Sequence, residues 1–197
     1  MVMPQDMAHT GPTRRKLRPE VAVVNIFALA DFGGNIEISD EEANRRALDF
    51  RRASAQVSYL RFPESPVLLR IFKSGKVRAT GGRSLSEVKT TLAALIPILR
   101  RSGRSVKLPH LEVLNMVSVV ALGYKLNLVH LASEAPDFVA YDPEFFPACV
   151  VRLTSGATGL VFGTGKVIIT GAKSMGSIRT AVDEVTELVR SSRALAP

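Results

Sequence analysis

The chain has 197 residues, of which 46% are hydrophobic and 22% are charged, a composition typical of a globular protein with one or two domains. No apolar run approaches the ~18 residues that a membrane helix needs, and no apolar segment follows the basic N-terminal residues, so we expect neither membrane association nor a signal peptide. The single cysteine, Cys149, excludes an internal disulfide and fits a reducing compartment.

The net charge of +8 is concentrated in the first part of the chain. Residues 1–110 hold 19 lysines and arginines against 10 acidic residues, whereas residues 111–197 hold 7 against 8. A basic region beside a near-neutral one favours a polyanionic ligand such as nucleic acid. The alternative is a basic surface that serves solubility alone.

A disordered basic arm is predicted over residues 1–19, and ordered elements follow it. The sequence then predicts a strand rich in β-branched residues, a helix with Ser39 or Asp40 as its N-cap, three further strands and an amphipathic helix with a serine N-cap. The predicted ranges are 21–29, 41–50, 56–62, 67–72, 76–80 and 84–101.

The same unit occurs a second time. Residues 71–84 read IFKSGKVRATGGRS and residues 161–174 read VFGTGKVIITGAKS, with seven of fourteen positions identical. The second copy predicts strands over 113–122, 149–153, 158–162 and 166–170 and a closing helix over 174–190. An internal repeat of this length indicates a pseudo-twofold molecule, which suits a ligand that is itself nearly twofold, and duplex DNA is one.

The predicted fold class is α+β. Two tandem β-α-β-β-β-α repeats, over 20–108 and 109–193, are expected to join their sheets into one curved, saddle-shaped antiparallel sheet with helices on the convex face. Strand alternation in the second repeat places Val161, Val167 and Ile169 under the helices and leaves another row on the open face. That open row consists of Leu160, Phe162, Ile168 and Thr170.

An open apolar face of this size usually marks an interaction site, although a partner chain or another segment could also cover it. In the first repeat the corresponding residues are Arg70, Phe72, Arg78 and Thr80. Arginines suit phosphates or the electronegative minor groove of DNA, and the phenylalanines suit wedges between base pairs, if they are not simply packed in turns.

Two asparagines occupy symmetric positions in the opening strands. Asn25 and Asn115 lie in apolar surroundings, where an amide needs a partner. An asparagine can donate to the acceptors that A·T pairs present in the minor groove. A structural role would be the simpler interpretation of one such residue, but the repetition favours recognition.

These features together resemble the TATA-box-binding protein family, from about residue 21 to about residue 189. The most specific segments are Tyr-Asp-Pro-Glu-Phe-Phe-Pro at 141–147 and the two Ser/Thr-Gly-Lys hairpins that end in Thr-Gly-x-Lys/Arg. The resemblance implies a general transcription initiation factor in the nucleus. Such a factor binds promoter DNA in the minor groove, bends it and nucleates the pre-initiation complex without a cofactor.

The resemblance also assigns roles to individual residues. It implies base contacts from Asn25, Asn115, Thr80 and Thr170, groove contacts from Val117, Leu160 and Ile168, and a DNA-kinking pair formed by Phe146 and Phe162. The implied phosphate contacts are Arg61, Lys76, Arg83, Arg152, Lys166 and Lys173. Phe27, Arg70, Phe72 and Arg78 complete the expected DNA-binding set. Asp142, Glu144 and Phe145 match the loop that docks a TFIIB-like factor, and TFIIA-like factors and other initiation subunits are further implied partners.

Several residues depart from the family pattern. Ala55 stands where the second wedge of the first repeat is expected, Arg70 and Arg78 replace aliphatic residues, and Phe27 replaces a smaller valine. Asp31 and Ala121 replace polar residues. These departures indicate a divergent member, such as those of early-branching eukaryotes that lack conventional TATA promoters.

The sequence favours no enzymatic function. The three histidines are scattered, and Gly163-Thr164-Gly165-Lys166 lacks the spacing of a phosphate-binding loop. The main alternative is a protein-binding adaptor with weak or non-TATA DNA binding. A DNA-repair enzyme with a half-saddle would need a catalytic lysine–aspartate helix-hairpin element, which the sequence does not contain.

Overall fold

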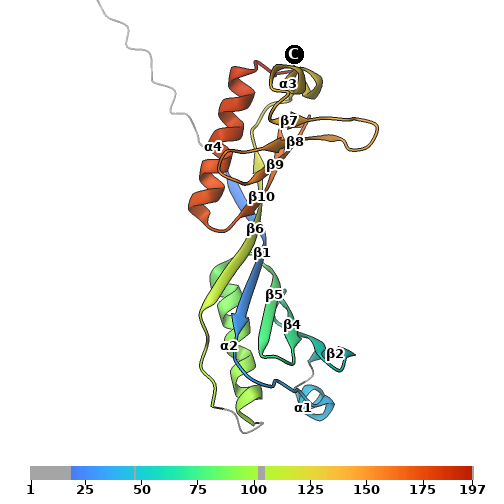
Figure 1. The fold of residues 1–197 in the computed structure, drawn as a ribbon, viewed down its shortest axis with the longest axis vertical. Coiled ribbons are helices and arrows are strands. Elements are labelled where there is room, and N and C mark those ends of the chain that lie inside the picture. The colour runs from blue at the N-terminus through green and yellow to red at the C-terminus, as the bar shows by residue number, and fades with distance from the viewer. Residues whose placement is uncertain (1–18, 47, 102–104, 197) are drawn as a thin grey trace, which may run out of the picture.

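A computed structural model describes residues 19–46, 48–101 and 105–196 of the chain. The arm expected over 1–19 lies outside the described residues except for Pro19. The molecule is elongated, with one repeat above the other along its long axis (Figure 1). The opening strands of the two repeats run side by side at the junction between them (Figure 1).

The first repeat consists of β1 (Val21–Asp31), α1 (Asp40–Arg45), β2 (Asp49–Ser54), β3 (Val57–Arg61), β4 (Leu68–Phe72), β5 (Lys76–Gly82) and α2 (Leu85–Arg101). The second repeat has the same order, with β6 (Leu111–Ala121), α3 (Leu128–Glu134), β7 (Val139–Ala140), β8 (Ala148–Arg152), β9 (Thr158–Phe162), β10 (Lys166–Ala172) and α4 (Met175–Ser191).

All ten of these strands form one antiparallel sheet in the order β2-β3-β4-β5-β1-β6-β10-β9-β8-β7. The order is symmetric about the central pair, in which Asn25 lies opposite Val117 and Phe27 lies opposite Asn115. The two opening strands therefore bring the two asparagine neighbourhoods together at the pseudo-dyad.

The predicted β-α-β-β-β-α order is wrong by one strand in each repeat. The segment 41–50, predicted as one helix, is helical only over Asp40–Arg45, and Asp49 already begins β2. In the second repeat the extra strand is β7, which is only two residues long. Both strands lie at the edges of the sheet, where one pairing partner suffices and the sequence pattern is weak.

The main helices cover one face of the sheet. Helix α2 packs on β5 and β1, and α4 packs on β10, β9 and β6. The face that they cover is buried and apolar, as the strand alternation predicts: Val161 and Ile169 are fully buried, and so is Val77 in the first repeat. The α+β fold with helices on one face of a joined sheet is thus confirmed.

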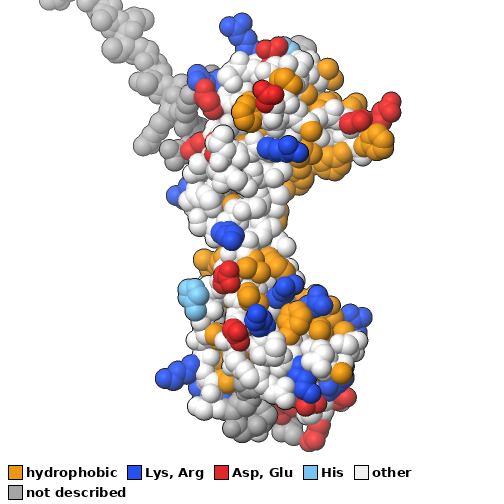
Figure 2. Space-filling view, in the orientation of Figure 1, with side chains coloured by type: hydrophobic (Ala, Val, Ile, Leu, Met, Phe, Trp, Pro, Cys, Tyr) orange, Lys and Arg blue, Asp and Glu red, His pale blue; other side chains and the backbone are white. Residues whose placement is uncertain are grey.

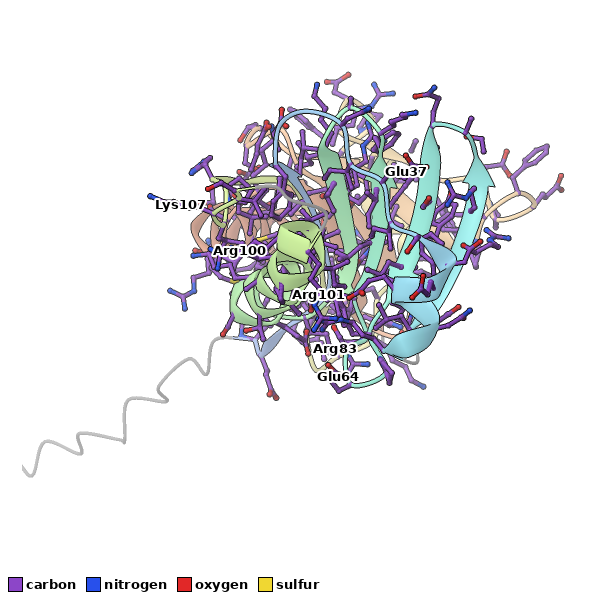
Figure 3. All side chains as sticks on the ribbon, turned by 90° about the horizontal axis from the view of Figure 1, so that it is seen from below. Glu37, Glu64, Arg83, Arg100, Arg101 and Lys107 are labelled. Carbon is purple, nitrogen blue, oxygen red and sulfur yellow. The ribbon has the colours of Figure 1, made fainter. Side chains whose placement is uncertain are left out.

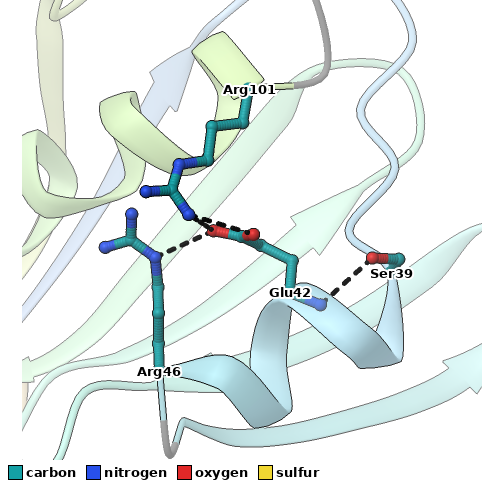
Figure 4. A network of polar contacts seen from close by, with 4 residues as sticks. All are labelled: Ser39, Glu42, Arg46 and Arg101. Atoms are coloured by element: carbon teal, nitrogen blue, oxygen red, sulfur yellow. Dashed lines mark hydrogen bonds and ion pairs between the residues drawn. The ribbon is translucent and has the colours of Figure 1, made fainter.

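Polar side chains cap helix α1 and join it to helix α2. Ser39 caps α1 by accepting from the Glu42 backbone N–H, one of the two caps that the sequence predicts. Glu42 in turn accepts from Arg46, at 2.8 Å, and from Arg101 at the end of α2, at 3.3 Å (Figure 4). This network joins α1 to α2 across 59 residues of sequence.

The end of α2 is held in a similar way. The Arg100 guanidinium donates to the Val106 carbonyl at 3.0 Å, which ties the segment between the repeats to the helix. Figure 3 shows Arg100, Arg101 and Lys107 around this end of α2, away from the hairpin strands. No helix in the described part of the chain is long and apolar enough to cross a membrane.

Candidate nucleic-acid interface

The two symmetric asparagines lie in matching hydrogen-bonded surroundings on the open face. We call each asparagine with its neighbouring Thr-Gly pair a cradle: Asn25 with Thr80-Gly81, and Asn115 with Thr170-Gly171. The Gly81 N–H donates to Asn25 Oδ1 at 2.8 Å, and the Gly171 N–H donates to Asn115 Oδ1 at the same distance. Both glycines have positive φ angles, 101° and 87°, a backbone conformation that residues other than glycine rarely adopt. The Thr-Gly pair of each hairpin thus shapes the cradle.

These bonds decide which end of each amide is available. A backbone N–H can bond only to the amide oxygen, so each NH₂ group must point elsewhere. In the second repeat Asn115 Nδ2 donates to Thr170 Oγ1 at 3.1 Å, whereas in the first repeat the Thr80 hydroxyl donates to Asn25 Oδ1 at 3.3 Å. Each cradle therefore offers hydrogen-bond donors, which is what the acceptor-only minor-groove edge of an A·T pair requires.

The second half of the open face is aliphatic and ends in an aromatic pair. Val117, Leu160, Ile168 and Thr170 are all partly buried there, on the side opposite the helices. Phe146 and Phe162 meet edge to face, with ring centroids 6.3 Å apart. Phe146 is 40% exposed, so the pair can reach a ligand.

The first half of the face is cationic. Arg70 and Arg78 are exposed and pair directly across β4 and β5, and their guanidinium groups lie 5.0 Å and 5.5 Å from the Phe72 ring centroid. Figure 2 shows this contrast: basic side chains gather over the lower repeat, while the corresponding edge of the upper repeat is mostly apolar. The outline of the molecule is hollowed between the two repeats on this side (Figure 2).

The strand register identifies the counterpart of Phe146 in the first repeat. Phe162 pairs with Ala148, two residues after Phe146, and Phe72 pairs with Val57. Two residues before Val57 lies Ala55, which is exposed. The strand register therefore gives Ala55 the position in the first repeat that Phe146 has in the second, and the wedge role of that position stays a prediction.

Six further cations frame the open face. They are all exposed and lie at strand ends, in matched positions of the two repeats. Arg61 ends β3 as Arg152 ends β8, and Lys76 begins β5 as Lys166 begins β10. Arg83 and Lys173 follow β5 and β10. This arrangement suits contacts to the two backbones of a duplex, which flank a groove.

The residues expected to bind a partner lie on a loop that projects from the β7–β8 hairpin (Figure 1). Asp142 forms the turn: its carboxylate accepts from the Glu144 N–H, and its carbonyl accepts from the Phe146 N–H. Phe145 at the tip is 87% exposed. A large apolar side chain so exposed, beside two acids, is typical of a protein-docking tip.

Sequence reasoning missed two residues of the face. Arg51 on β2 and Tyr59 on β3 pair directly with each other, and Tyr59 pairs with Arg70 on β4. The alternation of Tyr59 with Leu60 could have placed Tyr59 on the open face. Arg51 could not be placed on the open face because a helix was predicted over 41–50 and no strand was predicted at Asp49–Ser54, where Arg51 lies.

The histidine, cysteine and acidic side chains of the described residues are dispersed. No cluster of three or more histidine, cysteine or acidic side chains that could hold a metal ion occurs among them. Cys149 is fully buried, and burial raises the pKa of its thiol to about 11, which keeps it protonated and unreactive.

Comparison with known proteins decides the family. The family model of transcription factor TFIID, or TATA-binding protein, matches residues 20–102 and again residues 110–192. The chain belongs to the TATA-binding protein family. Two matches to one family model also account for the internal repeat that the sequence shows.

Individual relatives agree with this assignment. The chain is 30% identical to the TATA-box-binding protein of Methanocaldococcus jannaschii over 91% of this chain and 98% of that protein. It is 28% identical to TATA-box-binding protein-like 1 of Entamoeba histolytica, over 90% and 82% of the two chains. The solved Methanococcus jannaschii TBP structure superposes with a TM-score of 0.78 and 31% identity, covering 88% of this chain and 99% of that one.

Family membership makes this chain a transcription factor of the TATA-binding protein type. The family consists of DNA-binding transcription factors and is not known for enzymes. The departures noted above remain within a shared fold, since the solved relative covers both repeats.

Proposed function

We propose that the chain is a general transcription initiation factor that binds promoter DNA in the minor groove through its open sheet face and bends it. The single observation that carries this proposal is the pair of asparagine cradles. Two amides 90 positions apart, each with its oxygen occupied by a glycine N–H, offer donors at symmetric points of one face. An approximately twofold A·T-rich minor groove offers acceptors in a matching arrangement.

The surroundings of the cradles support the same proposal. The six framing cations neutralise phosphates on both sides of a groove, and the Phe146–Phe162 pair can enter between base pairs at one end. Each unstacked step costs a few kcal/mol, which apolar side chains and added contacts offset. Binding and bending are therefore one process.

An anisotropy titration tests this proposal. A short fluorescent duplex with an A·T-rich core is compared with a G·C-rich duplex of the same length at one salt concentration. We expect the A·T-rich duplex to bind more tightly by roughly 10-fold or more, the scale of one lost base-edge contact. Equal affinity for the two duplexes would mean that the face does not read bases.

We further propose that the loop at Asp142, Glu144 and Phe145 docks a TFIIB-like factor, so that bound DNA nucleates a pre-initiation complex in the nucleus. The exposed Phe145 beside two carboxylates supports a partner with an apolar pocket and a basic rim. TFIIA-like factors and other initiation subunits are further proposed partners.

The adaptor function remains the second candidate, because the first repeat lacks a complete wedge. In that case the protein would bind other factors and hold DNA only weakly. The titration separates the two candidates: an adaptor would bind its protein partner while showing no preference between the duplexes.

A further inference from the structure

A ladder of alternating guanidinium and aromatic groups crosses the first half of the open face. Arg51 lies 5.2 Å from the centroid of the Tyr59 ring, and Arg70 lies 5.7 Å from that centroid. Arg70 also lies 5.0 Å from the Phe72 ring centroid, and Arg78 lies 5.5 Å from it. The ladder ends where Arg78 lies 5.9 Å from the Phe27 ring centroid. We refer to these six residues as the arginine ladder.

The second repeat carries no such ladder among its described residues. The strand pairings place an apolar residue at every corresponding position. In the order Arg51, Tyr59, Arg70, Phe72, Arg78 and Phe27, the counterparts are Ala140, Val150, Leu160, Phe162, Ile168 and Val117. Three positive charges therefore distinguish the two halves of one pseudo-symmetric face.

The ladder holds its guanidinium groups ready for a ligand. Within the described residues, Arg51, Arg70 and Arg78 form no ion pair with a carboxylate and donate no hydrogen bond to the protein. Stacking on aromatic rings fixes the plane of a guanidinium and leaves its N–H groups along the edge free to donate. Such donors suit a narrow A·T minor groove, where the negative potential is strongest.

The same ladder opposes kinking in this half. The guanidinium groups of Arg70 and Arg78 lie 5.0 Å and 5.5 Å from the Phe72 ring centroid. The potential partner wedge of Phe72 is Ala55, whose side chain cannot reach between stacked bases. Duplex DNA with an intact, narrow groove is the ligand that fits.

We infer that the first repeat holds an unkinked A·T tract through Arg70 and Arg78, while the second repeat kinks flexible steps with Phe146 and Phe162. This inference rests on the proposed function. It means that the preferred DNA element is asymmetric: a stiff A-tract under the first repeat and flexible pyrimidine–purine steps under the second. Such an element fixes the orientation of the protein on DNA.

Fluorescence energy transfer between the protein and one end of the duplex measures the orientation of the protein on DNA. The donor is attached at Lys89→Cys, on the helix side of the first repeat, where Lys89 is exposed while the natural Cys149 is fully buried. The acceptor is placed on either end of a duplex that joins an A-tract to a run of TA steps. Transfer should be high from the A-tract end and low from the other. Equal transfer from both ends of a bound duplex would overturn the inference.

Variants without the charges of Arg70 and Arg78 test whether these two residues hold DNA. Arg70→Gln/Arg78→Gln should weaken binding to the A-tract element at least ~10-fold and lower the slope of log affinity against log salt by roughly 2, about 0.9 for each lost cation. It should also abolish the orientation preference. The matched control, Lys107→Gln/Arg179→Gln in the same Lys89→Cys background, removes two exposed cations, one from the segment after α2 and one from α4, and should keep both orientation and affinity. If the two variants behave alike, the ladder does not hold DNA.

The outcomes separate this inference from the proposed function. If the wild-type protein binds no duplex, or prefers the single strand of the same sequence, the proposed function fails and the inference fails with it. If the duplex is bound with A·T preference but without orientation, only the inference about the first repeat fails.

Discussion

Phe146 and Phe162 meet edge to face at the end of the second repeat, with ring planes inclined at 62°. In the first repeat the same two positions are Ala55 and Phe72, so half of the aromatic pair is absent. An alanine side chain cannot offset the cost of unstacking a base step, which is a few kcal/mol. DNA bending by this protein should therefore be lopsided, with one sharp kink beside the second repeat.

Ala55→Phe should increase the bend at the first repeat. Ala55 is exposed on the turn between β2 and β3, so the larger side chain meets no steric conflict in the core. End-to-end energy transfer on a short labelled duplex measures the bend. Phe146→Ala is the reciprocal variant and should reduce it. Equal bends for the wild type and Ala55→Phe would show that Ala55 does not occupy a wedge position.

Asn25→Ala or Asn115→Ala should weaken binding to an A·T-rich duplex by roughly 1–3 kcal/mol, the scale of a lost base-edge contact. Asn115→Asp is a sharper change, because it preserves the acceptor for the Gly171 N–H but removes the NH₂ group, whose second N–H is not used by the bond to Thr170 Oγ1. It should therefore weaken binding without loss of fold.

The control for this prediction is Asn127→Ala. Asn127 caps α3 by accepting from the His130 N–H, away from the open face, so its loss should lower stability by about 1 kcal/mol and spare DNA binding. Affinities of Asn25 and Asn115 variants that equal that of the wild type, with thermal unfolding unchanged, would exclude base reading by the amides.

Asp142→Arg/Glu144→Arg should abolish binding of a TFIIB-like factor and leave DNA binding intact. Charge reversal on an exposed turn costs little stability but sets like charges against a basic partner. A pull-down with the purified factor, beside a DNA titration of the same variant, measures both. Retention of the factor at the wild-type level would place its docking surface elsewhere.

Ser118→Ala should raise the free energy of unfolding by about 1 kcal/mol. Ser118 is fully buried in β6, and its hydroxyl oxygen has no hydrogen-bond partner among the described residues. Ser192→Ala is the matched control, because that buried hydroxyl donates to the Val189 carbonyl and its removal should destabilise. Chemical denaturation measures both; a destabilised Ser118→Ala would reveal a partner for the hydroxyl.

Much of this architecture can be predicted from the sequence because the repeat carries the information twice. The strand at Thr158–Phe162 has the predicted bounds, and the face that contains Leu160 and Ile168 follows from alternation alone. Asn25 and Asn115 stand out for the same reason: one amide in an apolar strand is ordinary, but two in register indicate a common role.

The missed features depend on contacts between distant segments. Strand β2 is exposed at nearly every residue, so its sequence carries no alternation, and only pairing with β3 defines it. The Arg51–Tyr59 end of the arginine ladder could not be predicted for that reason, because Arg51 joins Tyr59 through that pairing. The orientation of the asparagine amides was likewise unpredictable, since it depends on the backbone of Gly81 and Gly171.

The central claim is that the open face reads the minor groove of A·T-rich DNA, and base substitution in the duplex tests it most directly. Replacing A·T pairs at the centre of the bound duplex by inosine·cytosine changes the major-groove edge but leaves a minor groove without the guanine amino group. We predict affinity close to that of the A·T duplex for inosine·cytosine and a loss of roughly 1–3 kcal/mol per contacted pair for G·C. An inosine·cytosine duplex that binds as weakly as the G·C duplex would contradict minor-groove reading by this protein.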